Sequence, residues 1–432
     1  MKYYSLNGQS PKVGFKDATI RGQAPDKGLY FPESLPRLTE DWLNRFPHMS
    51  NEDIAFDVIR PYVENEIPED ELRRIIAETV NFPTPLVRIN DRISALELFH
   101  GPTLAFKDTG ARFMSRCLGY FAKAEHEKIT VLVATSGDTG GAVAHGFYGV
   151  DGVEVVILYP SGKVSSVQEK QLTALGKNIH ALEINGTFDD CQQMVKQAFA
   201  DSSVTAKRKL TSANSINIAR WLPQQFYYFF AIKQWEDLKN PPVICVPSGN
   251  FGNICAGILA HLSGLPIKHF IAACNSNDVV PRYLHSGQYH PEKAVPTLSN
   301  AMDVGNPSNF IRVLQLLENN FARIKKLLSG YSITDRETTS IIRSVWQETG
   351  YLLDPHGAVG YLSLQRYLDE NPNQKGCFLE TAHPVKFYDV IEPVIQEKVP
   401  VPASVQALIN LPKKSTPMGA DYEELKNYLL KN

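Results

Sequence analysis

The feature that most constrains the fold is an alternation of short β-branched runs with helix-like segments, which begins near residue 129. The runs predict strands over residues 129–134, 153–159, 179–184, 243–247, 267–274 and 376–382. The segment after the second run has apolar residues at near-helical spacing and stops at Gly176, which predicts a glycine cap at the end of a helix. Strands that alternate with helices in this way form largely parallel sheets. The sequence therefore predicts an α/β protein with parallel-rich, twisted sheets.

The first 95 residues differ from the rest of the chain. Amphipathic segments such as residues 69–80 are separated there by prolines at positions 61, 68, 83 and 85. This pattern predicts a helical N-terminal unit, with a boundary near the extended segment that Pro83 and Pro85 favour. A chain of 432 residues is long enough for two or three packed units, so the α/β region has room for more than one domain.

Composition and charge argue against several classes of function. The net charge is −2, from 44 basic and 46 acidic residues that are interspersed along the chain, which provides no basic surface for nucleic acid or an anionic membrane. The six cysteines form no C-x-x-C pair, so the sequence predicts neither a disulfide framework nor a metal site. No apolar run approaches the roughly 20 residues of a membrane span, and the first residues lack the apolar core of a signal peptide. We therefore expect a cytoplasmic protein.

A glycine-containing turn follows the predicted strand at 129–134. At the carboxyl end of a parallel strand such a turn lets the backbone approach a ligand, and the N-terminus of the following helix favours an anion. The spacing matches neither the dinucleotide motif nor the Walker-type phosphate motif. From this segment alone two interpretations stay open, an anion site or an ordinary turn capped by Asp138 and Thr139. The residues of the turn are Thr135, Ser136, Gly137, Asp138, Thr139 and Gly140.

A second turn of the same kind follows the predicted strand at 243–247. Its two glycines would let backbone amides surround a phosphate, and an apolar helix over 254–262 would direct its dipole at the same point. An ordinary turn is again the alternative. The residues are Ser248, Gly249, Asn250, Phe251, Gly252 and Asn253.

The segment HGPTLAFKDTGARF, residues 100–113, contains Lys107 between an apolar run and a predicted helix. We expect Asp108 or Thr109 to cap that helix and Lys107 to lie just outside its first turn. A cation there has the wrong sign for the helix dipole, and the apolar neighbours would lower the pKa of the amine by desolvation. A neutral lysine amine is a nucleophile that forms Schiff bases with aldehydes. The alternative is a lysine that extends to solvent or pairs with Asp108.

The order of these segments resembles that of the tryptophan-synthase-like, fold type II family of pyridoxal-phosphate enzymes. HGPTLAFKD, TSGDTG and GNFGN occur in that order, and TAHP follows at residues 381–384. GLYFPESLP, TSANSINIAR and TLSNAMDVGNPSN are similar to segments of the threonine synthases, so the resemblance covers nearly the whole chain. It implies an N-terminal unit over 1–95, a large-domain segment with the lysine over 96–111, a small αβ domain over 112–212 and a large cofactor-binding αβ domain over 213–432. The site would lie between the two αβ domains.

The resemblance also implies roles for individual residues. Lys107 would hold pyridoxal 5'-phosphate as a Schiff base and act as the catalytic base, and Thr381 would face the pyridine nitrogen. The loop that would bind the 5'-phosphate consists of Gly249, Asn250, Phe251, Gly252 and Asn253. The turn that would surround the α-carboxylate of the substrate consists of Thr135, Ser136, Gly137, Asp138 and Thr139. The residues that would bind the substrate phosphate are Ser215, Asn217 and Arg220, with a structural salt bridge as the alternative for Arg220.

The implied reaction converts O-phospho-L-homoserine and water to L-threonine and phosphate, by γ-elimination followed by β-replacement. Such an enzyme is a lyase of threonine biosynthesis. Two alternatives stay open, a threonine or serine dehydratase of the same fold and a cofactor-free relative that binds a phosphorylated amino acid as a sensor. We expect a monomer or homodimer whose partner is its small-molecule substrate, with no metal, nucleic acid or membrane.

Overall fold

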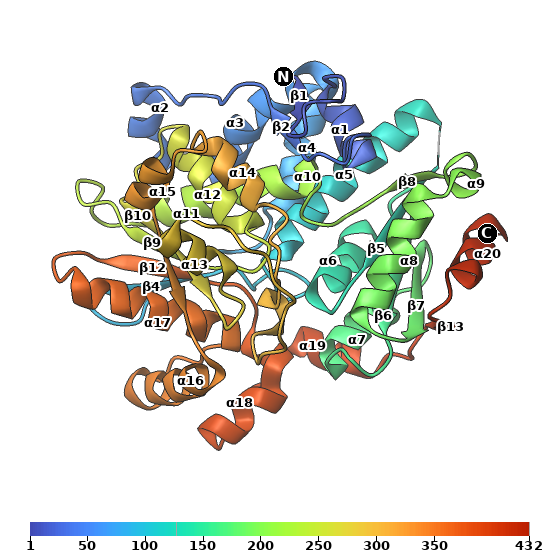
Figure 1. Ribbon diagram of the computed structural model, residues 1–432. Helices are drawn as coiled ribbons and strands as arrows, with labels where there is room; N and C mark the ends of the chain where they lie inside the picture. The colour runs from blue at the N-terminus through green and yellow to red at the C-terminus, as the bar shows by residue number, and fades with distance from the viewer. Residues whose placement is uncertain (127, 432) are drawn as a thin grey trace.

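The computed structural model describes residues 1–126 and 128–431, and its core is formed by two separate sheets with helices on their faces (Figure 1). The larger sheet has the strand order β11–β10–β9–β12–β4–β3, and neighbours are parallel except for the pair β3–β4. In that order the strands are Leu328–Ser332, His269–Cys274, Val243–Pro247, Gly376–Glu380, Ile93–Glu97 and Leu86–Arg88. The predicted α/β fold with parallel-rich sheets is confirmed.

The smaller sheet is parallel throughout, with the order β13–β7–β6–β5–β8. In that order its strands are Thr416–Gly419, Ile179–Asn185, Val153–Pro160, Ile129–Ala134 and Lys209–Thr211. Every residue of β5 and β6 is buried, as expected for parallel strands that are covered on both faces. This burial explains why continuous apolar runs, rather than alternating ones, predicted these strands.

The helices divide between the two sheets as Figure 1 shows. Those with the smaller sheet are α5 (Lys107–Glu125), α6 (Asp138–Phe147), α7 (Ser166–Thr173), α8 (Phe188–Ala200), α9 (Ser202–Thr205) and α20 (Tyr422–Lys431). Those with the larger sheet are α10 (Ile218–Trp221), α11 (Gln225–Lys233), α12 (Gly252–Leu262), α13 (Val279–Ser286), α14 (Phe310–Leu316), α15 (Phe321–Leu327), α16 (Asp335–Thr349), α17 (Pro355–Glu370) and α18 (Tyr388–Ile395). Helix α19 (Ala403–Ile409) packs against α7.

The N-terminal unit is mainly helical, as predicted, and packs on the larger part through aromatic side chains. It contains α1 (Phe15–Arg21), α2 (Glu40–Arg45), α3 (Asn51–Val63) and α4 (Glu69–Thr79), with the antiparallel pair β1 (Tyr3–Ser5) and β2 (Tyr30–Pro32). Trp42 stacks on Phe46, and both rings meet Phe229 of α11 edge-on. Such ring pairs add to the free energy of burial, so the unit is held on the larger part of the molecule.

The predicted strands correspond to β5, β6, β7, β9, β10 and β12, and the ranges of β5 and β9 agree at both ends. The prediction of a cap at Gly176 is wrong by two residues, because α7 ends at Thr173 with Ala174 as its cap. Gly176 instead has φ 74° in the turn before β7. Its left-handed backbone explains the glycine at that position.

The predicted division into domains stays a prediction, but two of its boundaries differ from the distribution of the strands. Residue 95 falls inside β4, which belongs to the larger sheet. The predicted large domain, 213–432, includes β13, which pairs with β7 of the smaller sheet. The C-terminus of the described chain therefore returns to the smaller sheet, where α20 follows (Figure 1).

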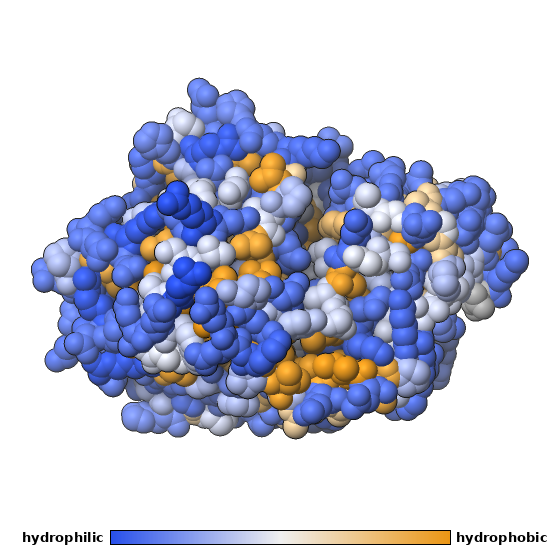
Figure 2. All heavy atoms as spheres, turned by 90° about the horizontal axis from the view of Figure 1, so that it is seen from below, coloured by the Kyte–Doolittle hydropathy of each residue, from blue (hydrophilic) through white to orange (hydrophobic). Residues whose placement is uncertain are grey.

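The face seen from below is mainly hydrophilic (Figure 2). It is hollowed between the part built on the larger sheet and the part built on the smaller sheet. Among the helices that the structure describes, none is both long and apolar enough to cross a bilayer.

Candidate active site

Lys107 begins helix α5, and the loop before it is fastened to the chain that follows strand β12. Ala105 forms an antiparallel bridge with Ala382. Beside that bridge, the Phe106 N–H donates to the Thr381 carbonyl at 2.9 Å. The two residues predicted to hold the cofactor and to face its ring, Lys107 and Thr381, therefore lie on neighbouring segments although they are far apart in sequence.

The start of α5 differs from the prediction. The helix begins at Lys107 itself, after Phe106, and no capping hydrogen bond from a side chain is found among the described residues. The Asp108 carboxylate accepts hydrogen bonds from the Thr103 N–H at 2.9 Å and from the Thr103 hydroxyl at 2.5 Å. The prediction that Asp108 or Thr109 caps the helix is wrong, because the Asp108 carboxylate closes the preceding loop instead.

The Lys107 amine is only partly exposed, and burial lowers its pKa to about 8. The negative charge of Asp138 opposes this shift, whereas the positive charges of Lys386 and Arg220 add to it. About one such amine in ten is unprotonated at pH 7, far more than for an ordinary lysine, and the unprotonated form is the nucleophile of Schiff-base chemistry. The environment of Lys107 therefore suits covalent attachment of an aldehyde.

The turn between β9 and α12 brings backbone close to a second segment. Phe251 has φ 62°, in the left-handed region, and α12 begins directly after it at Gly252. A Cβ on Gly249 would lie 2.7 Å from the Met302 Cα, so a larger residue would not fit without a backbone shift. The glycine is needed for this close approach.

Neutral amides and hydroxyls hold this turn in place. The Asn250 side chain donates to the Ser215 hydroxyl at 3.3 Å and accepts from the Ser308 N–H at 2.8 Å. The Tyr228 hydroxyl lies 2.9 Å from both the carbonyl and the side-chain oxygen of Asn253. The Asn253 Nδ2 is buried and has no hydrogen-bond partner among the described residues. An orphan amide donor beside free backbone N–H groups at a helix N-terminus favours an anion.

The residues present therefore fit pyridoxal phosphate. The β9–α12 turn offers donors and a helix dipole to its phosphate, and Lys107 offers an unprotonated amine to its aldehyde. The main support for a phosphate site at this turn is the buried Asn253 Nδ2, which has no hydrogen-bond partner among the described residues.

The turn between β5 and α6 is closed by Thr135. Its hydroxyl accepts hydrogen bonds from the Gly137 N–H at 3.0 Å and from the Gly140 N–H at 2.9 Å. The alternative that Asp138 and Thr139 cap this helix is therefore wrong, since Thr135 supplies the acceptor and Gly137 precedes the helix.

Asp138 has a different partner. Its carboxylate lies 2.6 Å from the Lys386 Nζ and accepts a hydrogen bond from the Gln168 side chain at 2.9 Å. Burial would raise the pKa of Asp138, but Lys386 and Lys107 hold it well below its usual range. The other two polar residues of the turn remain available to a ligand, because Ser136 is exposed and Thr139 is partly exposed.

Arg220 lies against helix α5, one turn beyond Lys107. A Cβ on Gly110 would lie 2.8 Å from the Arg220 carbonyl and 3.2 Å from its Nε, so glycine makes room for this arginine. The guanidinium donates to the Ala213 carbonyl, while its buried Nε has no hydrogen-bond partner within the described part of the chain. No ion pair of Arg220 is found there either, so the alternative of a structural salt bridge has no support. Since residues three apart share a helix face, the Nε lies on the Lys107 side of α5.

The other two predicted phosphate ligands differ from each other. The Ser215 hydroxyl accepts hydrogen bonds from the side-chain amides of Asn250 and Asn309, so its own proton is left to donate. Asn217 is fully buried: its Nδ2 donates to the Thr19 carbonyl at 2.8 Å and its Oδ1 accepts from the Ala219 N–H at 3.0 Å. Asn217 therefore caps α10 and holds the N-terminal unit, and its contacts do not support a role as a ligand.

Sequence reasoning assigned no role to Lys386, which lies in the short helix η5 (Pro384–Phe387) directly after Thr381 and His383. Its side chain is fully buried beside Lys107, Asp138 and the loop before α5. Its position in the sequence could have indicated a role, because it is a cation a few residues after the carboxyl end of a predicted strand. Ligands of α/β sheets bind at that end of the strands.

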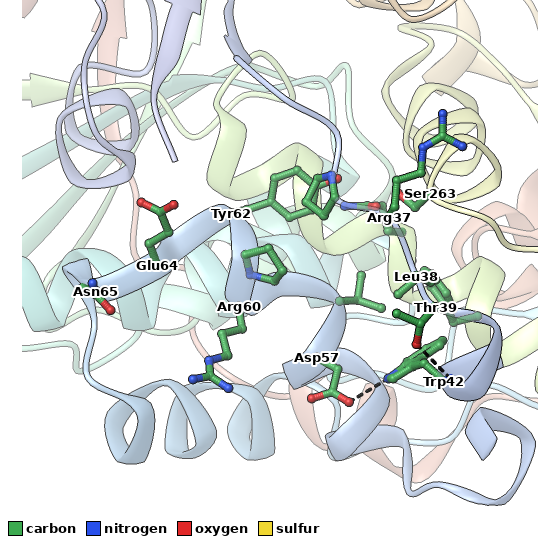
Figure 3. Close-up of a pocket in the computed structure, with 15 residues that line it drawn as sticks. Arg37, Leu38, Thr39, Trp42, Asp57, Arg60, Tyr62, Glu64, Asn65 and Ser263 are labelled. Carbon is green, nitrogen blue, oxygen red and sulfur yellow. Dashed lines mark hydrogen bonds between the residues drawn. The ribbon is translucent and has the colours of Figure 1, made fainter. Parts of the chain in front are cut away.

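A cavity of about 540 Å³ lies elsewhere, between the N-terminal unit and helix α11 (Figure 3). Tyr62, Gln225 and Ser263 line it, and beside them the Trp42 indole donates to Asp57 at 2.8 Å. None of the predicted site residues lines this cavity.

Comparison with family models divides the chain into three matched segments. Residues 77–379 match the model described as "Pyridoxal-phosphate dependent enzyme". Residues 2–80 match "Threonine synthase N terminus", and residues 357–429 match "Threonine synthase, C-terminal". Lys107, both turns and Arg220 lie within the first segment, which covers more than half of the chain.

Full-length relatives agree with these matches. The chain is 43% identical over 431 residues to the threonine synthase of Escherichia coli, covering 100% of this chain and 99% of that protein. It is 35% identical to the threonine synthase of Saccharomyces cerevisiae, covering 98% and 96% of the two chains. Among solved structures, the E. coli threonine synthase superposes with a TM-score of 0.92 at 42% identity over 100% of this chain and 99% of that one. A PLP-bound threonine synthase from Brucella melitensis gives 0.93 at 36% identity over 99% and 98%.

Proposed function

The chain belongs to the threonine synthase family of pyridoxal-phosphate enzymes, and from this premise we propose which of its residues act on O-phospho-L-homoserine. The Lys107 amine, with its pKa of about 8, is the observation that carries the assignment. It has the right environment to attach the cofactor and, once released, to take up and return a proton at the substrate Cα.

Pyridoxal phosphate, when bound, supplies the electron sink that acidifies first the Cα and then the Cβ hydrogens of the substrate. The β9–α12 turn binds its phosphate through Gly249, Asn250, Phe251, Gly252 and Asn253. Thr381 would offer a neutral hydroxyl to the ring nitrogen. Support for Thr381 comes from its hydrogen bond to the residue before Lys107.

The β5–α6 turn is proposed to bind the α-carboxylate of the substrate. Its residues Thr135, Ser136, Gly137, Asp138 and Thr139 lie at the N-terminus of α6, where N–H groups and the helix dipole favour a carboxylate. Within this set we assign the contacts to the backbone and to the hydroxyls of Ser136 and Thr139. The carboxylate of Asp138 would repel the substrate if it were not paired with Lys386.

Arg220 and Ser215 are the proposed ligands of the leaving phosphate. Support comes from the unpartnered Arg220 Nε and from the hydroxyl proton of Ser215 that no described contact requires. Once the phosphate has left, Cγ takes up the proton lost from Cβ, and the hydroxyl of water adds at Cβ. The remaining proton of water goes to the released phosphate, and the product is L-threonine.

The assignment is tested by incubating purified protein with pyridoxal phosphate, reducing with borohydride and mapping the labelled peptide. We expect the label on Lys107 in the wild type and none in Lys107→Ala. Lys123→Ala, an exposed lysine on the same helix, serves as the matched control and should keep the label. A label on another lysine would contradict the assignment.

A second assay separates the proposed reaction from that of a dehydratase. We expect phosphate release from O-phospho-L-homoserine with threonine formed in equal amount. Ammonia release from threonine or serine, without phosphate release, would instead indicate a dehydratase of the same fold.

We propose that the protein is located in the cytoplasm, because all six cysteines are free and buried, as is usual in reducing compartments.

A further inference from the structure

A buried ion pair joins the two sheets beside Lys107. Lys386 comes from η5, which follows strand β12 of the larger sheet, and Asp138 is the first residue of α6, which follows β5 of the smaller sheet. Lys386 is 0% exposed and Asp138 is 5% exposed, so water does not screen their charges. Their charged atoms lie 2.6 Å apart.

The same ammonium also holds the loop that leads into α5. The Lys386 Nζ donates to the Thr103 carbonyl at 2.9 Å. The Gln171 side chain of α7 donates to that carbonyl at 3.0 Å, and Gln168, one turn earlier on α7, donates to Asp138. The loop before Lys107, the β5–α6 turn and helix α7 are therefore connected through two charged side chains and two neutral ones.

On the basis of the function proposed above, we propose that Lys386 is a positioning residue. It fastens the β5–α6 turn to the loop before Lys107, and its charge, set against that of Asp138 beside the same amine, keeps Lys107 reactive.

The two charges of the ion pair have opposite effects on the pKa of Lys107. Asp138 stabilises the protonated form of Lys107, whereas Lys386 and Arg220 destabilise it. Without Lys386, an unpaired Asp138 would favour protonation of Lys107, and the pKa of that lysine would rise. Without the charge of Asp138, two cations would face Lys107, and its pKa would fall below about 8. The two changes therefore act in opposite directions, although each breaks the same ion pair.

Other charged and titratable groups near this cluster are Asp108 and Arg112 on α5, Arg220 on α10, Tyr227 on α11, His145 on α6 and His383 before η5. Burial lowers the pKa of His383 to about 4, so it is neutral in the pH range of interest. Burial, aided by Lys386, lowers the pKa of His145 to about 4, so His145 is neutral above pH 5. Burial raises the pKa of Asp108 and lowers that of Arg220 only to about 10. Arg220 therefore keeps its charge between pH 6 and pH 9, the range in which Lys107 titrates.

The test measures how fast Lys107 reacts with acetic anhydride in the full-length apoenzyme at a series of pH values, read by mass spectrometry of its peptide. The reagent carries no charge, so a change in site charge does not alter its local concentration. Lys386→Met should shift the midpoint upward by about one pH unit, with roughly tenfold slower labelling at pH 7. Asp138→Asn should shift it downward and speed labelling at that pH.

Two further variants separate charge from structure. Lys386→Arg keeps the charge and should hold the midpoint near that of the wild type. Gln171→Leu removes a hydrogen bond to the same Thr103 carbonyl without changing charge, and it too should leave the midpoint in place. If Lys386→Met and Asp138→Asn shift the midpoint in the same direction, or not at all, the ion pair is only structural and the inference is overturned.

The failure of this inference is distinguishable from failure of the proposed function. If Lys107 were not the cofactor lysine, the wild type would give no borohydride-trapped adduct at Lys107. This result would not depend on the pH midpoints of the acetic anhydride labelling. If Lys107 carries the adduct but the midpoints do not diverge, the function stands and only the role of Lys386 is rejected.

Discussion

The two glycine-containing turns of the site have the same local design but different partners. Each follows a buried parallel strand and begins a helix, β5–α6 in the smaller sheet and β9–α12 in the larger. The first contains Asp138, whose charge is balanced by a lysine from the other sheet. The second is held by the neutral groups of Ser215, Asn250 and Tyr228.

This difference follows from what each turn is proposed to bind. A cofactor phosphate stays in place through every turnover, so fixed neutral donors and a helix dipole are sufficient for it. The β5–α6 turn meets a substrate that enters and leaves, and its ion pair connects that turn to the lysine that reacts. Each turn can therefore be altered separately, and the effects should differ in kind.

The largest loss of activity is expected from Lys107→Ala, which removes the amine that is proposed to react with the cofactor and the substrate. Activity should fall by at least about a thousandfold, because both the covalent attachment and the proton transfer are lost. The β9–α12 turn should still bind pyridoxal phosphate without a covalent bond. Equilibrium dialysis of the variant measures this, and complete loss of binding would show that the turn holds no phosphate by itself.

Gly249→Val tests the second turn alone. Its Cβ would lie 2.7 Å from the Met302 Cα and 3.1 Å from the Ala301 carbonyl, so the backbone must shift. Overpacking of this kind typically costs about 1–3 kcal/mol, which predicts a rise of roughly 5- to 150-fold in the cofactor Kd.

Gly141→Ala in α6 is the matched control, since its Cβ would meet only the flexible Gln171 side chain. Fluorescence titration of the apoenzymes should show unchanged cofactor affinity for this control. An equal loss of affinity in both variants would remove the distinction between the turns.

Thr135→Val tests the first turn. The buried hydroxyl accepts from the Gly137 and Gly140 N–H groups, and each buried donor left without an acceptor costs about 1–3 kcal/mol. We expect KM for the substrate to rise about tenfold while cofactor affinity stays within about twofold. Thr135→Ser keeps the acceptor and should restore KM. A fall in cofactor affinity as large as that in KM would contradict the proposed separation.

The same two turns show what could be predicted from the sequence. Strands β5 and β9 were predicted with their observed bounds because buried parallel strands are continuous apolar runs. Short strands such as β8, β11 and β13 were missed, since they contain few residues or include Gly, Ser and Pro. The family, its cofactor and its function were predicted correctly from the order of the motifs, and the comparisons confirm them.

The details that failed depend on contacts between distant segments. Asp108 and Asp138 both have the residue type and position of helix caps, and neither caps its helix. Asp108 closes a loop through Thr103, and Asp138 pairs with Lys386, which follows a strand of the other sheet. A capping preference is worth about 1 kcal/mol, and a buried charge that would otherwise lack a partner costs more than that. Tertiary electrostatics therefore outweighed the local pattern at both sites.

The smallest effect is expected from Ser215→Ala, which lies between the two roles. The Ser215 hydroxyl accepts from Asn250 of the cofactor turn and from Asn309, and Ser215 is partly exposed, so water can replace it as an acceptor. Its loss should therefore weaken the cofactor turn by no more than about twofold in Kd. If the hydroxyl proton also donates to the substrate phosphate, KM should rise by about threefold to tenfold, since a hydrogen bond to a charged group contributes about 1.5–3 kcal/mol before water compensates.

Measuring both constants on the same variant decides which turn Ser215 belongs to. A rise in KM alone assigns it to the substrate, whereas a rise in cofactor Kd alone assigns it to the β9–α12 turn and contradicts its proposed place beside Arg220. Ser215→Thr keeps both the donor and the acceptor of the hydroxyl and serves as the conservative control. It should retain cofactor affinity and restore most of KM, because both kinds of hydrogen bond are kept.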